Sequence, residues 1–184
     1  MARLVVFDSV SLDGYFVDAN GDMRWAHRPD AEWEAFTAQN ASGNAALVFG
    51  RRTYEMMAGF WPSEQARAMN PQVADRMNAA LKIVFSRTLD RATWQNTMLV
   101  KDMLGAVRAL KAAPGPDMVI LGSGEIVAQL TEAGLVDEYQ IVVVPIVLGG
   151  GRTLFDGVKR RPVLTLQKSR AFGNGNVVNW YGAS

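Results

Sequence analysis

Strand-like and helix-like segments alternate along roughly the first 135 residues, and strand-like segments alone complete the chain. The hydrophobic patterns predict strands at 3–7, 45–50, 82–86, 118–121 and 139–148, and helices at 30–40, 53–59, 71–79, 102–113 and 125–134. Two further strands, 163–172 and 177–182, flank a Gly-Asn-Gly-Asn turn. Alternation requires crossover connections between parallel strands. We therefore predict one domain of residues 1–184, with three α/β/α layers around a mixed, mostly parallel sheet that ends in an antiparallel hairpin.

The composition excludes several kinds of site. The 184 residues contain no cysteine and a single histidine, His27, which rules out disulfides, thiolate nucleophiles and multi-histidine metal sites. Nineteen basic and eighteen acidic side chains give a net charge of +1, which argues against a nucleic-acid or membrane-surface binder. The N-terminal apolar run meets Asp8 too early to be a signal peptide or a membrane span. We expect a cytoplasmic protein without a metal, nucleic-acid or membrane partner.

Two predicted strands run into loops that carry arginine and a hydroxyl group. Gly50-Arg51-Arg52-Thr53 follows the second strand, and Ser86-Arg87-Thr88 follows the third. Because parallel strands end at one edge of a sheet, these loops are expected to lie together, with Thr53 capping the helix that follows. A helix N-terminus offers free N–H groups, and guanidinium groups add charge, so the pattern predicts a phosphate site. The alternative for each arginine is a solvated surface charge.

A glycine turn, Gly122-Ser123-Gly124, joins the fourth strand to its helix. Glycine tolerates positive φ and lets a diphosphate approach backbone N–H groups closely. The G-x-G-x-x-G pattern is incomplete, because Val127 stands where its third glycine would be. The alternative is a turn that only packing requires. The later glycines 149–151 are interpreted as a turn or bulge.

Five segments, in chain order, resemble the dihydrofolate-reductase-like superfamily: SLDGY, FGRRTYE, FSRT, ILGSGEIVAQLTEAGLVDEY and PIVLGGGRTLF. They are most similar to stand-alone relatives of the C-terminal reductase domain of the bifunctional riboflavin-biosynthesis enzyme. The resemblance covers about residues 3–181. It implies a dihydrofolate-reductase-like fold and a nicotinamide cofactor, NADPH.

The resemblance also implies three groups of cofactor-binding residues. The adenosine end, with its 2′-phosphate, would contact Gly50, Arg51, Arg52, Thr53, Ser86 and Arg87. The diphosphate and nicotinamide side would contact Gly122, Ser123, Gly124, Glu125 and Ile126, beneath a loop formed by Leu12, Asp13 and Gly14. A preference for NADP over NAD follows, because a 2′-phosphate needs cationic partners whereas a bare ribose is usually met by an acid.

Asp30 is the candidate catalytic acid. Folate reductases carry an acid five residues after a tryptophan, and Trp25 and Asp30 have this spacing. In that role Asp30 would help to protonate the substrate as hydride arrives. The alternative is that Asp30 simply caps the first helix.

The predicted substrate pocket is walled by Trp25 and Trp61. For Trp33, helical spacing favours a position in the core. Arg152 and Lys159 are candidates, by position only, for contact with a phosphate on the substrate.

Two functions are compatible with these features. The first is an NADPH-dependent reductase that transfers hydride to a small heterocyclic substrate, pterin- or pyrimidine-like, or to a carbonyl compound. The second is a non-catalytic nucleotide-binding or regulatory protein that keeps the fold. Strand 139–148 and the last hairpin are suited to packing across a two-fold axis, so a homodimer is expected.

Overall fold

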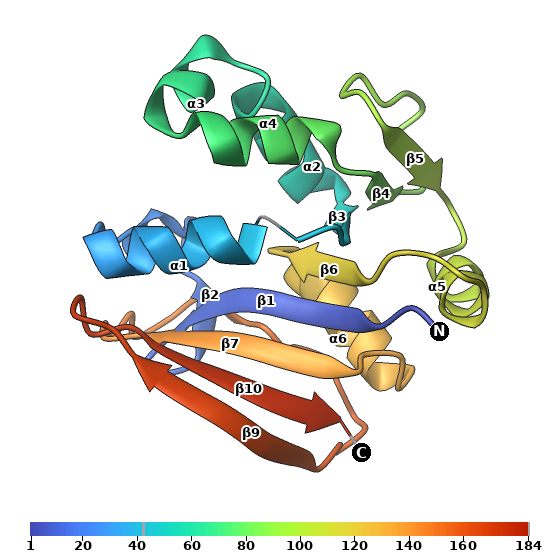
Figure 1. Ribbon diagram of the computed structural model, residues 1–184. Helices are drawn as coiled ribbons and strands as arrows, with labels where there is room; N and C mark the ends of the chain where they lie inside the picture. Colours follow the sequence, from blue (N-terminus) through green and yellow to red (C-terminus); the bar gives the residue numbers. More distant parts are fainter. Residues whose placement is uncertain (42, 184) are drawn as a thin grey trace.

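One eight-stranded sheet organises the computed structural model, which describes residues 1–41 and 43–183 (Figure 1). Its strands follow in the order β5 (Thr97–Val100), β4 (Lys82–Phe85), β3 (Ala46–Gly50), β6 (Met118–Leu121), β1 (Leu4–Ser11), β7 (Glu138–Val144), β10 (Val177–Ala183) and β9 (Leu164–Ala171). Pairs from β5 to β7 are parallel, and β10 is antiparallel to both β7 and β9. The mixed sheet with a closing hairpin is therefore confirmed.

Helices cover both faces of this sheet. They are α1 (Ala31–Ala41), α2 (Arg51–Phe60), α3 (Glu64–Met69), α4 (Pro71–Ala79), α5 (Met103–Ala112) and α6 (Gly124–Glu132), preceded by the 3-10 turn η1 (Arg24–Ala26). Apolar residues of α5 and α6 pack on one face, and those of α1, α2 and α4 pack on the other. The three-layer prediction is thus confirmed. In the described part of the chain, no helix is long and apolar enough to span a membrane.

Helix boundaries follow local capping chemistry. The predicted helix 71–79 coincides with α4, where the Asn70 side chain accepts a hydrogen bond from the Val73 N–H at 3.1 Å. Gly134 adopts a φ of +66° just after α6, as its expected capping role requires. The expectation that Thr53 caps α2 is wrong, since the helix begins at Arg51 and Gly50 is its N-cap. The sequence patterns also missed β5, a four-residue, half-exposed edge strand.

Lys82 is a buried charge that closes the junction between α4, β4 and β5. Its ammonium group donates hydrogen bonds to the carbonyl oxygens of Asn78, Ala80 and Gln95 at 2.7, 2.9 and 3.0 Å. It also lies 4.3 Å from the centroid of the Trp94 ring. The ammonium therefore donates to three backbone carbonyl oxygens that meet at this junction.

Replacing Lys82 by methionine is expected to lower the free energy of unfolding by about 2–3 kcal/mol, because the carbonyl oxygens of Ala80 and Gln95 lose the Lys82 donor inside the fold. Urea unfolding followed by circular dichroism measures this change, with Lys101→Met, at an exposed position, as the matched control. Equal midpoints for the two variants would contradict the assigned role.

Strand β9 forms one edge of the sheet and is largely exposed. Leu166 on this strand keeps 54% of its surface accessible. The homodimer expected from the sequence stays a prediction, and sedimentation equilibrium would decide it.

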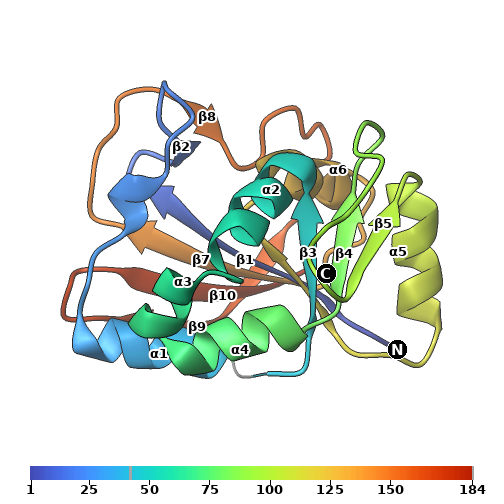
Figure 2. The ribbon, with the colours of Figure 1, turned by 90° about the horizontal axis from the view of Figure 1, so that it is seen from above.

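A second, two-stranded sheet pairs β2 (Tyr15–Val17) with β8 (Arg152–Thr153). This pairing brings the segment that follows β7 next to the loop that follows β1. Elements remote in the sequence thus meet at the edge where the parallel strands end (Figure 2).

Candidate functional site

The loops singled out in the sequence follow adjacent strands. Because β4, β3, β6 and β1 are neighbours and parallel, the loops that follow them open at one edge of the sheet. In Figure 2 the arrowheads of β3 and β4 reach this edge, with α2 and α6 beside them. We call the residues 11–14, 50–53, 86–88 and 122–124 the strand-end rim.

Side-chain hydrogen bonds join three of these loops to one another. The Arg51 guanidinium donates to the Thr88 hydroxyl at 2.9 Å, which links the loops after β3 and β4. The Ser123 hydroxyl accepts from the Gly50 N–H at 2.9 Å and donates to the Thr53 hydroxyl at 2.9 Å, which links the loops after β3 and β6. The predicted convergence of these loops is therefore present as a connected network.

The glycine turn is tight in both backbone and packing. Gly122 has a φ of +60°, and a Cβ added to it would lie 3.2 Å from the Thr53 Cγ2. Ser123 is itself left-handed, with a φ of +65°. A Cβ at Gly124 would lie 3.0 Å from the Phe16 ring. Packing therefore does require these glycines, and the same tight turn brings the start of α6 onto the rim.

Helices α2 and α6 begin on this rim without a side-chain cap, whereas α1, α3, α4 and α5 are each capped by their own Asp, Ser or Asn. Gly50 has no side chain to offer α2, and the Ser123 hydroxyl is turned towards α2 instead of capping α6. Two helix N-termini therefore present backbone N–H groups and partial positive charge side by side. This arrangement suits an anion such as a diphosphate.

Exposed arginines lie at the start of α2 and in the loop after β4 beside it. Arg51, Arg52 and Arg87 are all exposed at the rim. Arg51 also pairs with Glu55 at 2.8 Å, one turn along α2. Ser86, by contrast, is buried, and its hydroxyl accepts hydrogen bonds from the N–H groups of the two residues that form the turn after Arg87. Ser86 thus shapes the loop that carries Arg87.

Asp13 fixes the loop after β1 through hydrogen bonds. Its carboxylate accepts hydrogen bonds from the Ser11 hydroxyl at 2.6 Å and from the N–H groups of Leu148 and Gly149 at 3.1 and 2.8 Å. These bonds, with that of Ser11 the strongest, lower the pKa of Asp13 to about 2. The carboxylate therefore ties this loop to the 149–151 glycines, while the neighbouring Leu12 keeps 66% of its surface exposed.

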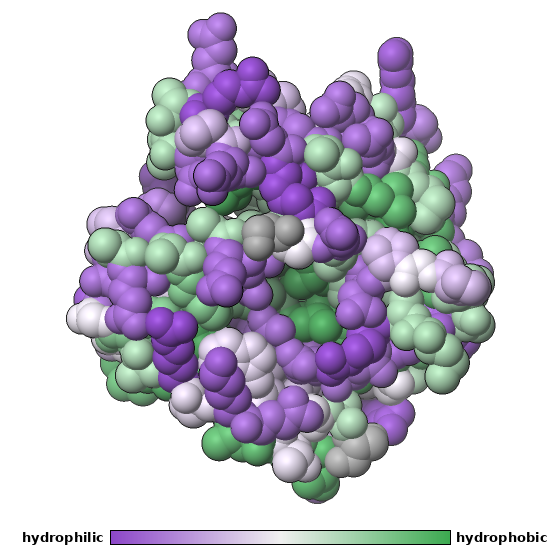
Figure 3. Space-filling view, in the orientation of Figure 1, coloured by the Kyte–Doolittle hydropathy of each residue, from purple (hydrophilic) through white to green (hydrophobic). Residues whose placement is uncertain are grey.

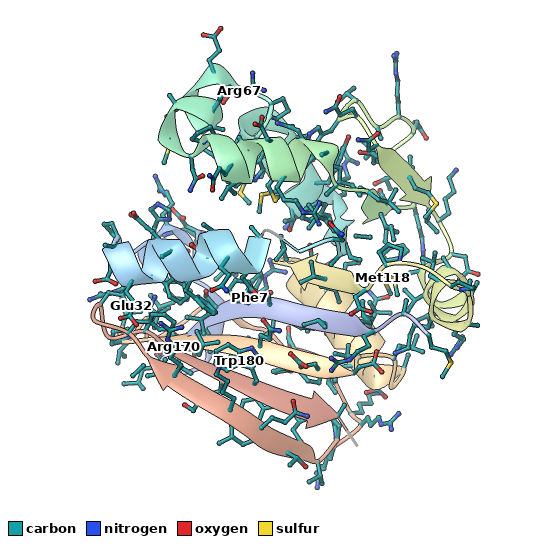
Figure 4. The ribbon with its side chains drawn as sticks, in the orientation of Figure 1. Phe7, Glu32, Arg67, Met118, Arg170 and Trp180 are labelled. Atoms are coloured by element: carbon teal, nitrogen blue, oxygen red, sulfur yellow. The ribbon has the colours of Figure 1, made fainter. Side chains whose placement is uncertain are left out.

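A cleft of about 480 Å³ crosses the sheet face between α1 on one side and α2 and α4 on the other. It is the hollow in Figure 3 with hydrophobic residues on its floor and hydrophilic residues at its margin, between Phe7 and Met118 as labelled in Figure 4. The floor and walls are mainly apolar: Val5, Phe7, Leu47, Val119, Leu121, Trp33, Met57, Trp61, Val73 and Met77. Leu121 immediately precedes Gly122, so the inner end of the cleft adjoins the strand-end rim.

The predicted pocket tryptophans have different positions. Trp61 lines the cleft, whereas Trp25 lies outside its lining. Trp25 donates from its indole N–H to the Asp22 carbonyl at 3.0 Å. It packs beneath α1 on a buried apolar cluster made of Val142, Val144, Phe172 and Val178. Trp33, expected in the core, packs edge-on against Phe172 at 5.0 Å and also lines the cleft. Helical spacing identified the inward face of α1, but it could not reveal a cavity against that face.

Asp30 has the capping role. Its Oδ1 accepts a hydrogen bond from the Trp33 N–H at 3.0 Å, and Oδ2 lies against Gly173, 3.2 Å from where a Cβ would be. It lies outside the set of cleft-lining residues. The assignment of Asp30 as a catalytic acid, taken from the folate-reductase spacing, is not supported by this geometry.

The sequence interpretation missed the polar residues of the cleft. They are Glu34, Thr37 and Asn40 on α1, Arg76 on α4, Asp117 and Gln140 near strand starts, and Arg28. His27, the single histidine noted in the sequence, also lines the cleft. The three on α1 recur every third residue, which places them on one helix face. That spacing was the available signal. The Asn40 amide donates a hydrogen bond to the Gln140 side chain at 3.4 Å.

Comparison with known proteins identifies the fold. Residues 2–178 match the RibD C-terminal domain family. The chain belongs to this family. Over 184 residues it is 28% identical to the uncharacterized protein YyaP of Bacillus subtilis (strain 168), covering 98% of this chain and 96% of YyaP. A second uncharacterized protein of that organism, YwjB, is 24% identical over 93% of this chain and 92% of its own length.

Solved structures resemble the whole chain. A putative riboflavin biosynthesis protein from Shewanella sp. PV-4 is 25% identical with a TM-score of 0.76, covering 100% of this chain and 99% of its own. A deaminase/5-amino-6-(5-phosphoribosylamino)uracil reductase from Thermotoga maritima is 14% identical with a TM-score of 0.67, and the similarity covers 57% of that longer chain. These neighbours confirm the riboflavin-type, dihydrofolate-reductase-like fold that the sequence motifs indicated.

Proposed function

We propose that this protein is an NADPH-dependent reductase of a small heterocyclic or carbonyl substrate. The observation that carries the proposal is the pair of uncapped helix N-termini, of α2 and α6, on a rim with exposed arginines. This rim adjoins an apolar cleft at Leu121. An anion-binding edge next to a ring-sized cleft suits a dinucleotide whose nicotinamide meets a substrate. Membership of a family that includes reductases supports an oxidoreductase in general.

Each part of the rim has a proposed role. Arg51 and Arg87 would hold the 2′-phosphate, with Arg52 and Thr53 beside them. The N–H groups at the start of α2 and α6, reached across Gly50 and the 122–124 turn, would hold the diphosphate. Leu12 and Gly14 would cover the nicotinamide, and Glu125 and Ile126 would lie behind it in the first turn of α6.

The protein itself mainly positions two rings and excludes water. When bound, reduced nicotinamide supplies a hydride, which together with one proton reduces a C=N, C=C or C=O bond. Because Asp30 is occupied in capping α1, we assign the proton to solvent at the polar margin of the cleft rather than to that carboxyl group.

Cofactor titration followed by turnover tests the proposal. Trp33 and Trp61 line the cleft, so NADPH binding at its inner end is expected to quench tryptophan fluorescence. Mixing the protein with NADPH and a panel of uncharged heterocycles and enones is then expected to consume NADPH. Failure to bind NADPH would contradict the proposal, whereas binding without turnover of any panel member would favour a non-catalytic nucleotide-binding protein.

A further inference from the structure

We propose that the cleft takes a flat, uncharged ring compound, and that it does not accept a substrate carrying a phosphate. This inference deepens the proposed reductase function and rests on it. It also separates this chain from the Thermotoga maritima reductase, whose name specifies a phosphoribosylated uracil.

Helix capping distinguishes the cleft from the strand-end rim as a place to bind an anion. Two of the three helices that wall the cleft are capped by side chains: Asp30 caps α1 and Asn70 caps α4. The third, α2, begins at the strand-end rim. The first turn of α1 also carries Glu32 and Glu34, and Glu34 lines the cleft. Negative charge at this position repels a phosphate. The uncapped N-termini belong to α2 and α6, on the strand-end rim.

The charged side chains that line the cleft do not form a concentrated positive site. Two arginines, Arg28 and Arg76, are matched by two carboxylates, Glu34 and Asp117, with His27 as the remaining titratable group. Both arginine side chains already donate hydrogen bonds to backbone carbonyl oxygens. Arg76 donates to the carbonyl oxygens of Gly43 and Ala45, the latter at 2.8 Å, and Arg28 donates to that of Asn174 at 3.3 Å. A phosphate is normally held by several donors that converge on it.

The two basic residues expected to meet a substrate phosphate lie elsewhere. Arg152 forms an ion pair with Glu125 at 3.4 Å, at the start of α6. The backbone N–H of Lys159 donates to Glu132 at 2.8 Å, near the end of the same helix. Both residues lie outside the cleft lining, so neither supplies the missing charge.

Aromatic walls and a few polar groups favour a planar ring. Trp33 and Trp61 stand on opposite sides of a floor that includes Phe7, and aromatic faces pack well on flat rings. Thr37 and Gln140 add a hydroxyl and an amide to the lining. Such a cleft, apolar with a few polar groups that fix orientation, suits a neutral heterocycle.

Binding to the cofactor-free protein tests the inference, so the result does not depend on turnover. The probes are quinoxaline, a flat uncharged bicycle, and the matched pair uridine and uridine 5′-monophosphate, measured by isothermal titration calorimetry. Quinoxaline is expected to bind. Thr37→Phe, which fills the cleft, should weaken that binding more than tenfold, whereas Ala35→Phe, at an exposed position of the same helix, should leave it unchanged. Circular dichroism of both variants verifies that they fold.

The phosphate comparison is read from the same titrations. Uridine 5′-monophosphate is expected to bind no more tightly than uridine. Binding tenfold tighter than uridine, reduced again by Arg76→Gln, would overturn the inference, as would quinoxaline binding that is absent or insensitive to Thr37→Phe. None of these outcomes decides the reductase proposal, because that proposal fails only if NADPH does not bind or is not turned over.

Discussion

Replacing Arg51 and Arg87 together by alanine is expected to weaken NADPH binding by about 100-fold and to change NADH binding by less than about threefold. A hydrogen bond to a charged group contributes roughly 1.5–3 kcal/mol, so loss of two such bonds removes at least about 3 kcal/mol, or about 100-fold in affinity. Only NADPH carries the 2′-phosphate that these guanidinium groups would contact. Titration of both cofactors against the double variant measures the difference.

The matched control is the double variant Arg67→Ala and Arg108→Ala. Both residues are exposed, on α3 and α5 (Arg67 is labelled in Figure 4), and the change in net charge is the same. It should leave the NADPH preference intact. An equal loss of NADH and NADPH affinity in the Arg51 and Arg87 variant would contradict the assignment of these residues to the 2′-phosphate.

Replacing Asp8 by asparagine is expected to remove a pH dependence of stability worth on the order of 4 kcal/mol between pH 4 and pH 7. Asp8 lies within β1, only 4% exposed, and its Oδ2 has no hydrogen-bond partner among the described residues. Burial raises the pKa of its carboxyl group to about 8. Between the unfolded pKa, near 3.9, and 8, the folded protein holds a proton that the unfolded chain has lost. The stabilisation is therefore complete below about pH 4 and is lost as the pH rises towards 8.

The difference between wild type and Asp8→Asn isolates this group, because other carboxylates titrate equally in both proteins. Denaturant unfolding at half-unit pH steps should show the wild type losing stability more steeply than the variant. Asp90→Asn, at an exposed position, is the control and should follow the wild type. Parallel curves for wild type and Asp8→Asn would show that the carboxyl group titrates normally.

Much of the fold could be predicted from the sequence because local signals agreed with the tertiary structure. Apolar runs became core strands, and Asn70 and Gly134 stand at helix ends where their side-chain and backbone chemistry requires them. Convergence of the loops at 50–53, 86–88 and 122–124 followed from a rule about parallel strands. Edge strand β5 was missed because its four residues, Thr97–Val100, are too few to show a periodic pattern.

Prediction of the cleft was less successful, because a cavity depends on the gap between elements rather than on any one segment. The spacing of Trp25 and Asp30 matched a folate-reductase pattern, yet Trp25 packs beneath α1 and Asp30 caps it. Both positions follow from how α1 sits on the β9–β10 hairpin, to which Glu32 is tied by Arg170 at 2.7 Å (Figure 4). No pattern within residues 25–30 encodes that contact.

A crystal structure of this protein with NADPH is the most direct test of a dinucleotide lying along the strand-end rim. We predict diphosphate oxygens within hydrogen-bond distance of the first N–H groups of α2 and α6, the 2′-phosphate between Arg51 and Arg87, and the nicotinamide beside Leu121 at the inner end of the cleft. Cofactor bound on another face, or with its adenosine in the cleft and its nicotinamide beside the arginines, would contradict the account.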